Sequence, residues 1–264
     1  AVEVTKIHSV AGVLGASEGI VAVRPFRSPH HTATVPALIG GGAKARPGEV
    51  SLAHNGVLFL DEMPEYSRRT LETLRQPLED KKVFVSRVMH SVEYPANFML
   101  VASMNPCPCG NYGSRTQTCR CTAAQIHNYL AKLSGPLLDR IDLLIEVDGV
   151  EYAELRGKGG SESSAAVKER VERARAVQRA RFAGTGINTN AQMNAKDMAK
   201  WCVVDENGER LLKRAFDKMG LTARAAARIL KVARTIADLA GEENILSVHL
   251  AEAIQYRNTE RKYI

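Results

Sequence analysis

An apolar segment that ends in two adjacent carboxylates, GVLFLDEMPEY from Gly56 to Tyr66, constrains the fold of this chain more than any other part of the sequence. Its residues Val57 to Leu60 do not alternate with polar residues, which indicates a strand covered on both faces in an α/β sheet. Ligands of such sheets bind at the carboxyl ends of the strands. There Asp61 could hold a hydrated Mg²⁺ while Glu62 polarises a water molecule against a phosphate, although an acidic turn would give the same short pattern.

Length and composition narrow the class of protein. The chain has 264 residues, of which 45% are hydrophobic and 25% charged, as in globular proteins of one large domain or two modest ones. No apolar run approaches the ~18 residues of a membrane span and no signal peptide is visible, so we expect a cytoplasmic protein without a membrane partner. The net charge of +7 favours nucleic acid as a partner. Because the sequence starts at Ala1 without Met, we expect it to be cut from a longer protein.

The composition changes along the chain and predicts three parts. Residues 1–150 mix buried-type strands, Gly/Pro turns and short helices, which predicts an α/β core. Residues 151–185 combine a Gly/Ser-rich linker with an amphipathic helix, and residues 186–264 carry helical patterns only, as an all-α domain would. Within the core, residues 21–47 form a basic, irregular insertion, and residues 81–95 predict a β-hairpin.

Helix boundaries are visible in the last part. Asn194 is expected to cap one helix, a second runs from Asp205 toward Lys218, and a third runs from Thr222 until Gly241 ends it.

Two more segments predict strands that carry polar groups. Residues 97–106, NFMLVASMNP, predict a buried strand followed by Asn105, and residues 137–147, LLDRIDLLIEV, predict a third strand with Arg140 before its apolar run. Carboxylates for metal and water, an amide that orients the water and a guanidinium for phosphate charge together suit phosphoryl transfer. Taken singly, Asn105 could be a turn residue and Arg140 could pair with a neighbouring aspartate.

Five segments in order resemble one family, the AAA+ ATPases of the magnesium chelatase group, in the branch of ComM-like and YifB-like proteins. The segments are PFRSPHHTATVPALIGGG, GEVSLAHNGVLFLDEMPE, YPANFMLVASMNPCPCG, GPLLDRIDL and LTARAAARILKVARTIADL. The resemblance spans nearly the whole chain. It implies a parallel sheet flanked by helices, followed by an all-α lid domain.

The resemblance also implies roles for single residues. Asp61 and Glu62 would be the Walker B acids, with Asp61 on Mg²⁺, and Asn105 would be sensor 1. Arg140 would be the arginine finger that acts on a neighbouring subunit's ATP, and Arg224 would be sensor 2 on a nucleotide phosphate. Such proteins form homo-oligomeric, hexameric rings that move on DNA, with branch migration during natural transformation as the implied task.

Arg224 has a second interpretation. With Arg228, Lys231 and Arg234 it forms a basic stripe at helical spacing, which could be a solvated helix face.

One expected motif is absent from the sequence. A P-loop reads Gly, four residues, then Gly-Lys-Ser/Thr, because its backbone amides and lysine hold the phosphates, and no such string occurs. In the family the P-loop lies shortly before the segment similar to EVTKIHSVAG. We therefore expect the sequence to begin just past the first strand and the P-loop, and the 264-residue chain alone to be inactive as an ATPase.

Basic residues in the insertion and the hairpin are candidates for DNA contact, because related rings turn such insertions toward their pore. Electrostatic attraction to phosphates would dominate, although a basic loop could simply be solvated. The candidates are Arg24, Arg27, Lys44, Arg46, Arg87 and His90.

Four cysteines lie in one segment, CPCGNYGSRTQTCRC, at positions 107, 109, 119 and 121. In a reducing compartment such a cluster favours tetrahedral Zn²⁺ over disulfides, and a closed site of four thiolates would be structural. The two C-x-C pairs differ from the usual C-x₂₋₄-C spacing, so four reduced thiols remain the alternative. Cys107, Cys109, Cys119 and Cys121 are the candidate ligands.

The remaining patterns add little. His30 and His31 are adjacent, and neighbours on an extended chain point in opposite directions, so we expect no shared ion and assign no histidine a catalytic role.

Three other functions remain as alternatives. Two would use the same ATPase residues: a magnesium chelatase motor that drives metal insertion into a porphyrin, and a transcription-activator ATPase. The third is a non-catalytic nucleic-acid-binding or scaffold domain. The cysteines and basic insertions favour DNA over the porphyrin.

Overall fold

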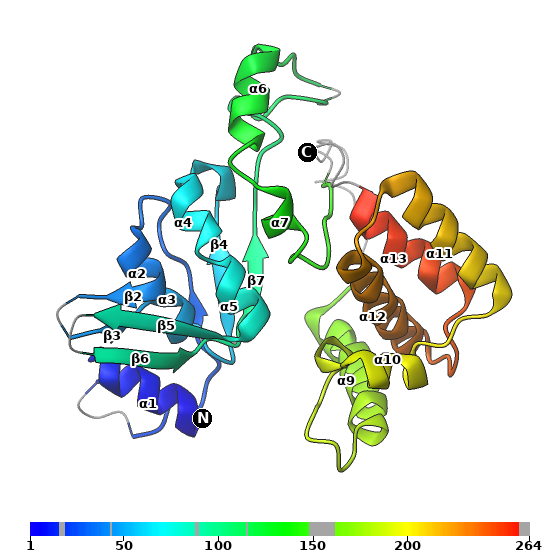
Figure 1. The fold of residues 1–264 in the computed structure, drawn as a ribbon, viewed down its shortest axis with the longest axis horizontal. Helices are drawn as coiled ribbons and strands as arrows, with labels where there is room; N and C mark the ends of the chain where they lie inside the picture. The colour runs from blue at the N-terminus through cyan, green and yellow to red at the C-terminus, as the bar shows by residue number, and fades with distance from the viewer. Residues whose placement is uncertain (16–18, 43, 88–89, 115, 148–161, 259–264) are drawn as a thin grey trace. The chain divides into compact units, whose positions relative to one another are not determined.

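The computed structural model describes residues 1–264 except 16–18, 43, 88–89, 115, 148–161 and 259–264 (Figure 1). The chain divides into two compact units, Ala1–Ile141 and Asp142–Lys262, which we call the α/β unit and the helical unit. Each unit has its own cluster of buried apolar side chains. None of the described helices is both long enough and apolar enough to cross a membrane.

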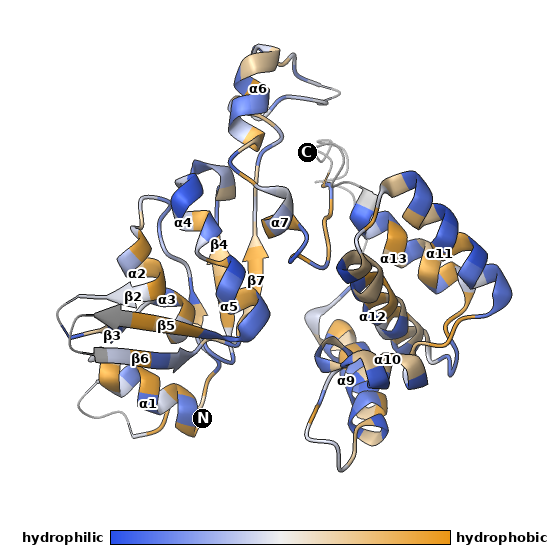
Figure 2. Ribbon diagram, viewed as in Figure 1, coloured by the Kyte–Doolittle hydropathy of each residue, from blue (hydrophilic) through white to orange (hydrophobic). Residues whose placement is uncertain are grey.

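A parallel sheet in the order β1, β4, β7 lies in the α/β unit. Its strands are β1 (Phe26–Arg27), β4 (Val57–Leu60) and β7 (Met99–Ala102). In the central strand β4, Leu58 and Leu60 are fully buried while Val57 and Phe59 are half-buried, and Figure 2 shows β4 and β7 as hydrophobic. A Cβ at Gly56 would lie 2.0 Å from the Pro25 carbonyl oxygen, so only glycine allows β1 to start this close to β4. The predicted α/β fold with a parallel sheet is confirmed.

Short helices accompany the sheet, and polar caps begin many of them. Thr34, Ser67, Thr122 and Ser134 each accept a hydrogen bond from a backbone N–H three residues later, as N-cap side chains do. The helices are α1 (Val2–Ala11), α2 (Val35–Ile39), α3 (Glu49–Leu52), η1 (Met63–Glu65), α4 (Arg68–Glu72), α5 (Arg75–Asp80), α6 (Ala123–Leu130) and α7 (Gly135–Leu138).

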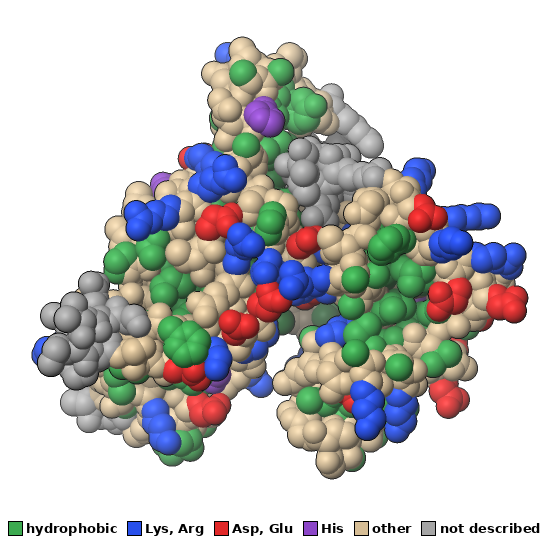
Figure 3. All heavy atoms as spheres, in the orientation of Figure 1, with side chains coloured by type: hydrophobic (Ala, Val, Ile, Leu, Met, Phe, Trp, Pro, Cys, Tyr) green, Lys and Arg blue, Asp and Glu red, His purple; other side chains and the backbone are tan. Residues whose placement is uncertain are grey.

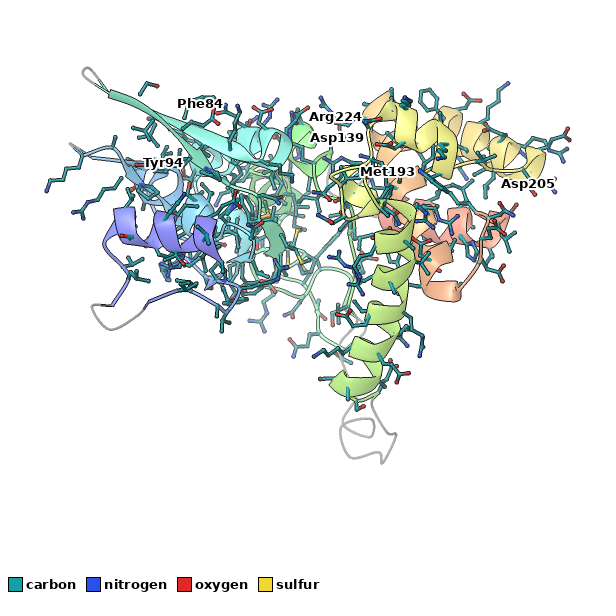
Figure 4. All side chains as sticks on the ribbon, turned by 90° about the horizontal axis from the view of Figure 1, so that it is seen from below. Phe84, Tyr94, Asp139, Met193, Asp205 and Arg224 are labelled. Atoms are coloured by element: carbon teal, nitrogen blue, oxygen red, sulfur yellow. The ribbon has the colours of Figure 1, made fainter. Side chains whose placement is uncertain are left out.

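Two antiparallel pairs lie outside the main sheet. The segment predicted as a hairpin forms β5 (Lys82–Arg87) and β6 (His90–Pro95), and the basic insertion contains the short strands β2 (Gly40–Gly41) and β3 (Arg46–Pro47). Side chains on the hairpin alternate between its faces, because Phe84 is exposed whereas Tyr94 is buried and donates a hydrogen bond to Ala45 O at 2.9 Å (Figure 4).

The strand predicted over residues 137–147 is wrong. Ser134 caps α7, and Pro136 occupies the first helical turn, so the start of this segment is helical. Residues 141–147 then run without regular structure, and Ile145 and Val147 are 67% and 87% exposed. An apolar run forms a strand only where a neighbouring strand hydrogen-bonds to its backbone. No strand of the described chain pairs with residues 137–147.

The helical unit consists of helices whose ends follow the sequence signals. Asn194 accepts hydrogen bonds from the N–H groups of Lys196 and Asp197, and Gly241 ends a helix with φ 79°, so both predicted boundaries are confirmed. The elements are α9 (Ser164–Arg181), η2 (Asn190–Gln192), α10 (Ala195–Trp201), α11 (Glu206–Met219), α12 (Ala223–Ala240) and α13 (Ser247–Asn258). In Figure 3, hydrophobic side chains are visible over the α11 and α12 part of this unit.

A buried ionic cluster joins α9, η2 and α12. The Asp238 side chain has 0% exposure and accepts hydrogen bonds from Arg181 Nη1 at 2.8 Å, Asn190 Nδ2 at 2.7 Å and Arg234 Nε at 3.1 Å. Burial opposes ionisation, but the hydrogen bonds from Arg181 and Asn190 and the charges of both arginines outweigh it and lower the pKa of Asp238. Two guanidinium groups thus compensate one buried carboxylate.

Candidate functional site

The two carboxylates of the strand-end motif lie at the carboxyl end of β4, where hydrogen bonds join them to the end of β7. Ser103 follows β7 and donates a hydrogen bond from Oγ to Asp61 Oδ1. The Glu62 N–H donates to Asp61 Oδ1 at 3.1 Å and to Ser103 Oγ at 3.2 Å. The backbone ladder continues past the strands, from Ser103 N–H to Leu60 O at 3.0 Å and from Met63 N–H to Ser103 O at 2.9 Å. These bonds fix the orientation of Asp61 while both acidic residues stay exposed.

Glu62 has an unusual backbone. Its φ of 50° and ψ of 48° place it in the left-handed region, which costs a non-glycine residue about 1 kcal/mol or more. The turn ends β4 abruptly and starts η1 with Met63, so the Glu62 side chain lies at the rim of the sheet. Strained residues held by surrounding hydrogen bonds are frequent at functional sites.

His31 contacts Glu62, and sequence reasoning missed this contact. Its Nδ1 lies 3.4 Å from Glu62 Oε2. The rings of His30 and His31 pack with centroids 4.1 Å apart, so the expectation that they point in opposite directions is wrong. The chain around them is not a regular strand, and alternation holds only in strands.

Tyr66 holds the histidine segment in place. Its hydroxyl donates a hydrogen bond of 2.5 Å to the Pro29 carbonyl, and its ring meets the His31 ring edge-on. Burial, and then the charge of Asp61, raise the pKa of Tyr66 to about 12, so the hydroxyl stays a donor across the physiological range.

Asn105 lies on the loop after β7 and is exposed. Tyr129 of α6 is buried nearby, and its hydroxyl interacts with the Asn105 backbone. Burial, followed by the negative charge of Glu65, raises the pKa of Tyr129. The structure therefore brings Asp61, Glu62 and the start of the Asn105 loop to neighbouring strand ends, as predicted from the strand pattern.

Arg140 follows α7 and forms an ion pair within the α/β unit. Its Nη2 pairs with a carboxylate oxygen of Glu79 from α5, and its Nη1 donates to Pro136 O at 2.6 Å. The Arg140 side chain is 10% exposed, at the wall of a cavity of about 560 Å³. The cavity is lined by Val35, Ile39, Glu72, Thr73, Arg75, Gln76, Glu79, Asp80, Val83 and Arg140.

Arg224 lies in the first turn of α12 and is exposed (Figure 4). The basic stripe that it begins is not a uniformly solvated face. Arg228 pairs with Asp142, and Arg234 is 2% exposed within the ionic cluster around Asp238. The end of the stripe therefore stabilises the helical unit, whereas its beginning faces solvent.

The basic candidates of the insertion differ in how their charge is used. Arg27 forms two hydrogen bonds with Glu49, at 2.6 and 2.8 Å, and chiefly this bonding raises the pKa of Arg27. Arg24 donates to the Asn55 carbonyl at 2.6 Å and remains exposed. Arg27 is thus neutralised within the chain, while Arg24 keeps its charge toward solvent.

The four other candidates for DNA contact lie near the β2–β3 pair and at the end of the hairpin. Lys44 and Arg46 are exposed beside the β2–β3 pair. The side chains of Arg87 and His90, at the hairpin end, lie outside the part of the chain that the structure describes.

The four clustered cysteines come together in space. Their Sγ atoms all lie within 4.8 Å of one another, and every cysteine is free. The Sγ atoms lie 3.4 Å apart in Cys107 and Cys109, 3.6 Å apart in Cys109 and Cys119, and 3.7 Å apart in Cys107 and Cys119. The cluster could hold a metal ion. Cys202, the fifth cysteine, is buried in the core of the helical unit.

Comparison with known proteins agrees with this arrangement. Residues 1–155 match the family model of magnesium chelatase, subunit ChlI, and residues 161–257 match that of its C-terminal part. The chain belongs to the magnesium chelatase family. It is 49% identical over 236 residues to competence protein ComM of Haemophilus influenzae, covering 89% of this chain and 45% of that protein. It is 46% identical over 245 residues to YifB of Salmonella typhimurium and over 242 residues to YifB of Escherichia coli, covering 91% of this chain and 47% of each relative.

The chain therefore spans about half the length of these curated relatives. Membership of the magnesium chelatase family supports an AAA+ ATPase-type protein. The predicted core of parallel sheet and helices with a C-terminal helical region agrees with the two family models.

Sequence reasoning missed two residues at this edge of the sheet, Ser103 and His31. Ser103 is the first residue past β7, and a hydroxyl at that register position opposite Asp61 was a readable signal once β4 and β7 were expected as neighbours. The contact of His31 with Glu62 has no local signal, because it depends on the irregular course of the insertion.

Proposed function

We propose that this chain forms the core and helical lid of an ATP-hydrolysing ring motor that acts on DNA. The observation that carries the proposal is the pair Asp61 and Glu62 at the carboxyl end of the central strand, with Asp61 oriented by Ser103 from the neighbouring strand. Both acids are exposed and can receive a ligand. Family membership supports the ATPase class.

The residues at this edge fit Mg²⁺ and ATP. Mg²⁺ prefers carboxylate and water oxygens, and it would neutralise charge on the phosphates. Asp61 would hold the ion, directly or through water, because hydrogen bonds from Ser103 and the Glu62 N–H leave its second oxygen available. Glu62 would orient and polarise the attacking water, with the Asn105 amide as a second partner of that water.

In the proposed ring, two arginines would supply positive charge to the nucleotide phosphates. Arg140 would act on the nucleotide of a neighbouring subunit, which requires it to exchange Glu79 for phosphate oxygens. Arg224, exposed at the start of α12, would contact the nucleotide's phosphate from the lid. We take the assembly to be a homo-oligomer, as a hexameric ring.

The proposal that DNA is the substrate rests on the positive charge of the chain and on the name of one relative. The chain has a net charge of +7, and Arg24, Lys44 and Arg46 expose their charge on the insertion. Competence protein ComM is named for competence. Movement along DNA with branch migration in natural transformation, in the cytoplasm, is the task that we propose. Zn²⁺ on the four cysteines would be structural.

The test uses the full-length protein that contains this chain. Glu62→Gln should bind ATP and lose turnover by about 10²–10⁴-fold, because the water loses its polarising carboxylate. Glu65→Gln, the same change nearby in η1, should hydrolyse ATP normally. DNA should stimulate hydrolysis by the unchanged protein and bind in a salt-dependent manner. Equal turnover by the two variants would reject Glu62 as the acting carboxylate, and stimulation by a metal-free porphyrin instead of DNA would favour the chelatase function.

Mixing variants tests the ring. Arg140→Ala should bind ATP but lose turnover by about 10³-fold or more. When Arg140→Ala and Glu62→Gln subunits are mixed, some interfaces pair an intact Glu62 with an intact Arg140, so part of the activity should return. No recovery in mixed assemblies would place Arg140 in its own subunit's site or outside catalysis.

A further inference from the structure

We propose that Cys107, Cys109, Cys119 and Cys121 bind one Zn²⁺ that holds the loop between β7 and α6 and thereby positions α6 beside the carboxylate edge. The positioning half of this inference rests on the proposed function. The metal site itself does not.

The sulfur positions match tetrahedral thiolate coordination. Zinc–sulfur bonds of about 2.3 Å in a tetrahedron separate neighbouring sulfurs by about 3.8 Å. Three Sγ pairs are 3.4, 3.6 and 3.7 Å apart, and all four Sγ atoms lie within 4.8 Å of one another. These distances exceed a disulfide bond of about 2.05 Å and bring four thiols around one point. Four soft thiolates select Zn²⁺ over the hard Mg²⁺ expected at Asp61.

The loop has little else to hold it. The described residues of the segment 103–122 form no helix or strand, and only Cys107 among them is buried. Tyr112, the largest apolar side chain of the loop, is 55% exposed. Loops of this length without secondary structure are uncommon in compact domains, and segments without an apolar core are usually held by a disulfide or a metal.

The charges near the cysteines are compatible with a thiolate-bound Zn²⁺. Between Ser103 and Ala131 the sequence has two arginines and no acidic residue, and Figure 3 shows the projecting part over α6 with few charged side chains. The net negative charge of a Zn²⁺ with four thiolates would therefore meet no carboxylate of its own loop.

Both ends of the loop reach the carboxylate edge. Its first residues include Asn105, directly after β7. Its last residue, Thr122, caps α6 in a reciprocal capping box with Gln125. Helix α6 contacts η1, which begins directly after Glu62. Tyr129 of α6 interacts with the Asn105 backbone. A metal that fixes the cysteines thus fixes the approach of α6 to η1.

The first test measures metal in the full-length protein. Elemental analysis should find about one zinc per chain, and Co²⁺ exchanged into the site should give the visible absorption of tetrahedral thiolate coordination. Cys119→Ser should lose the metal and melt at a lower temperature. Cys202→Ser, which replaces a cysteine outside the cluster, should keep the metal. Metal-free protein with the melting temperature of the zinc-loaded protein, or equal metal loss in both variants, would overturn the site.

The second test addresses positioning without any activity measurement. Chelation of the unchanged protein should increase amide hydrogen exchange in α6 and η1 and leave α12 protected, and Zn²⁺ should reverse the effect. Unaltered exchange in α6 and η1 after complete zinc removal would refute the positioning role. Glu62→Gln should keep its zinc, so failure of the proposed ATPase function is distinguishable from failure of the metal site.

Discussion

The two units of the molecule use carboxylates in opposite ways. In the helical unit, Asp238 is fully buried, and Arg181 and Arg234 compensate its charge. In the α/β unit, Asp61 and Glu62 are exposed, and their contacts include a serine hydroxyl, a backbone N–H and the His31 ring. A charge that stabilises the fold is neutralised within the chain. The carboxylates for which we propose a ligand stay accessible, so their charge can be compensated from outside the chain.

The energetic consequence follows from solvation. A buried carboxylate loses its water and is stable only with its partners, so removal of either member leaves an uncompensated charge. An exposed carboxylate keeps its water, so its removal costs the fold little.

The largest effect is expected for Asp238→Asn. The change keeps the side-chain shape but leaves two buried guanidinium groups without their counter-charge, and should lower the free energy of unfolding of the helical unit by about 3–5 kcal/mol. Asp61→Asn, the same chemical change at an exposed strand end, should alter stability by less than about 0.5 kcal/mol. Urea unfolding followed by circular dichroism measures both. Similar losses of unfolding free energy in the two variants would contradict the contrast between the buried and the exposed carboxylate.

Acid should destabilise the helical unit through protonation of Asp238. The folded-state pKa of Asp238 lies below its unfolded value, so its contribution is complete above about pH 4 and is lost as the pH falls through the folded-state pKa. Thermal unfolding of the unchanged protein between neutral and acid pH should therefore show destabilisation below about pH 4. In Asp238→Asn this part of the pH dependence should be absent, and its persistence would assign the acid sensitivity to other groups.

A smaller loss of stability than that of Asp238→Asn is expected for Tyr66→Phe. Loss of the hydrogen bond to the Pro29 carbonyl should cost about 1 kcal/mol, whereas Tyr112→Phe at an exposed position should cost nothing measurable. Because the folded-state pKa of Tyr66 is raised to about 12, its contribution is complete below the unfolded value near 10 and is lost as the pH rises toward 12. Alkaline titration of tyrosine absorbance should show a group near pH 12 that Tyr66→Phe removes.

The sequence predicts β4, the end of β7 and the helix caps because these depend on local pattern. The apolar run before Asp61, the cap Asn194 and the stop Gly241 each carry their own signal. The segment 137–147 carries the same apolar signal as β4 but has no ladder partner among the described strands, so pattern alone misled there. Pairing, unlike periodicity, is a property of the whole sheet.

Long-range contacts were harder to foresee. The spacing of Arg234 and Asp238 by four residues is a readable helical ion pair, yet nothing local shows that it is buried or that Arg181 joins it. The contact between His31 and Glu62 also has no local signal, because it depends on the course of the chain between the two residues. The four cysteines are the exception, because their crowding in one short segment indicates their proximity.

The left-handed backbone of Glu62 has a consequence for attempts to engineer this protein. Glycine would adopt this conformation without steric cost, and asparagine with less, so a library screened only for heat resistance should enrich both at this position. Either replacement removes the carboxylate. Thermal selection at this site would therefore discard the side chain on which the proposed hydrolysis depends, and any stabilisation programme has to hold residue 62 constant.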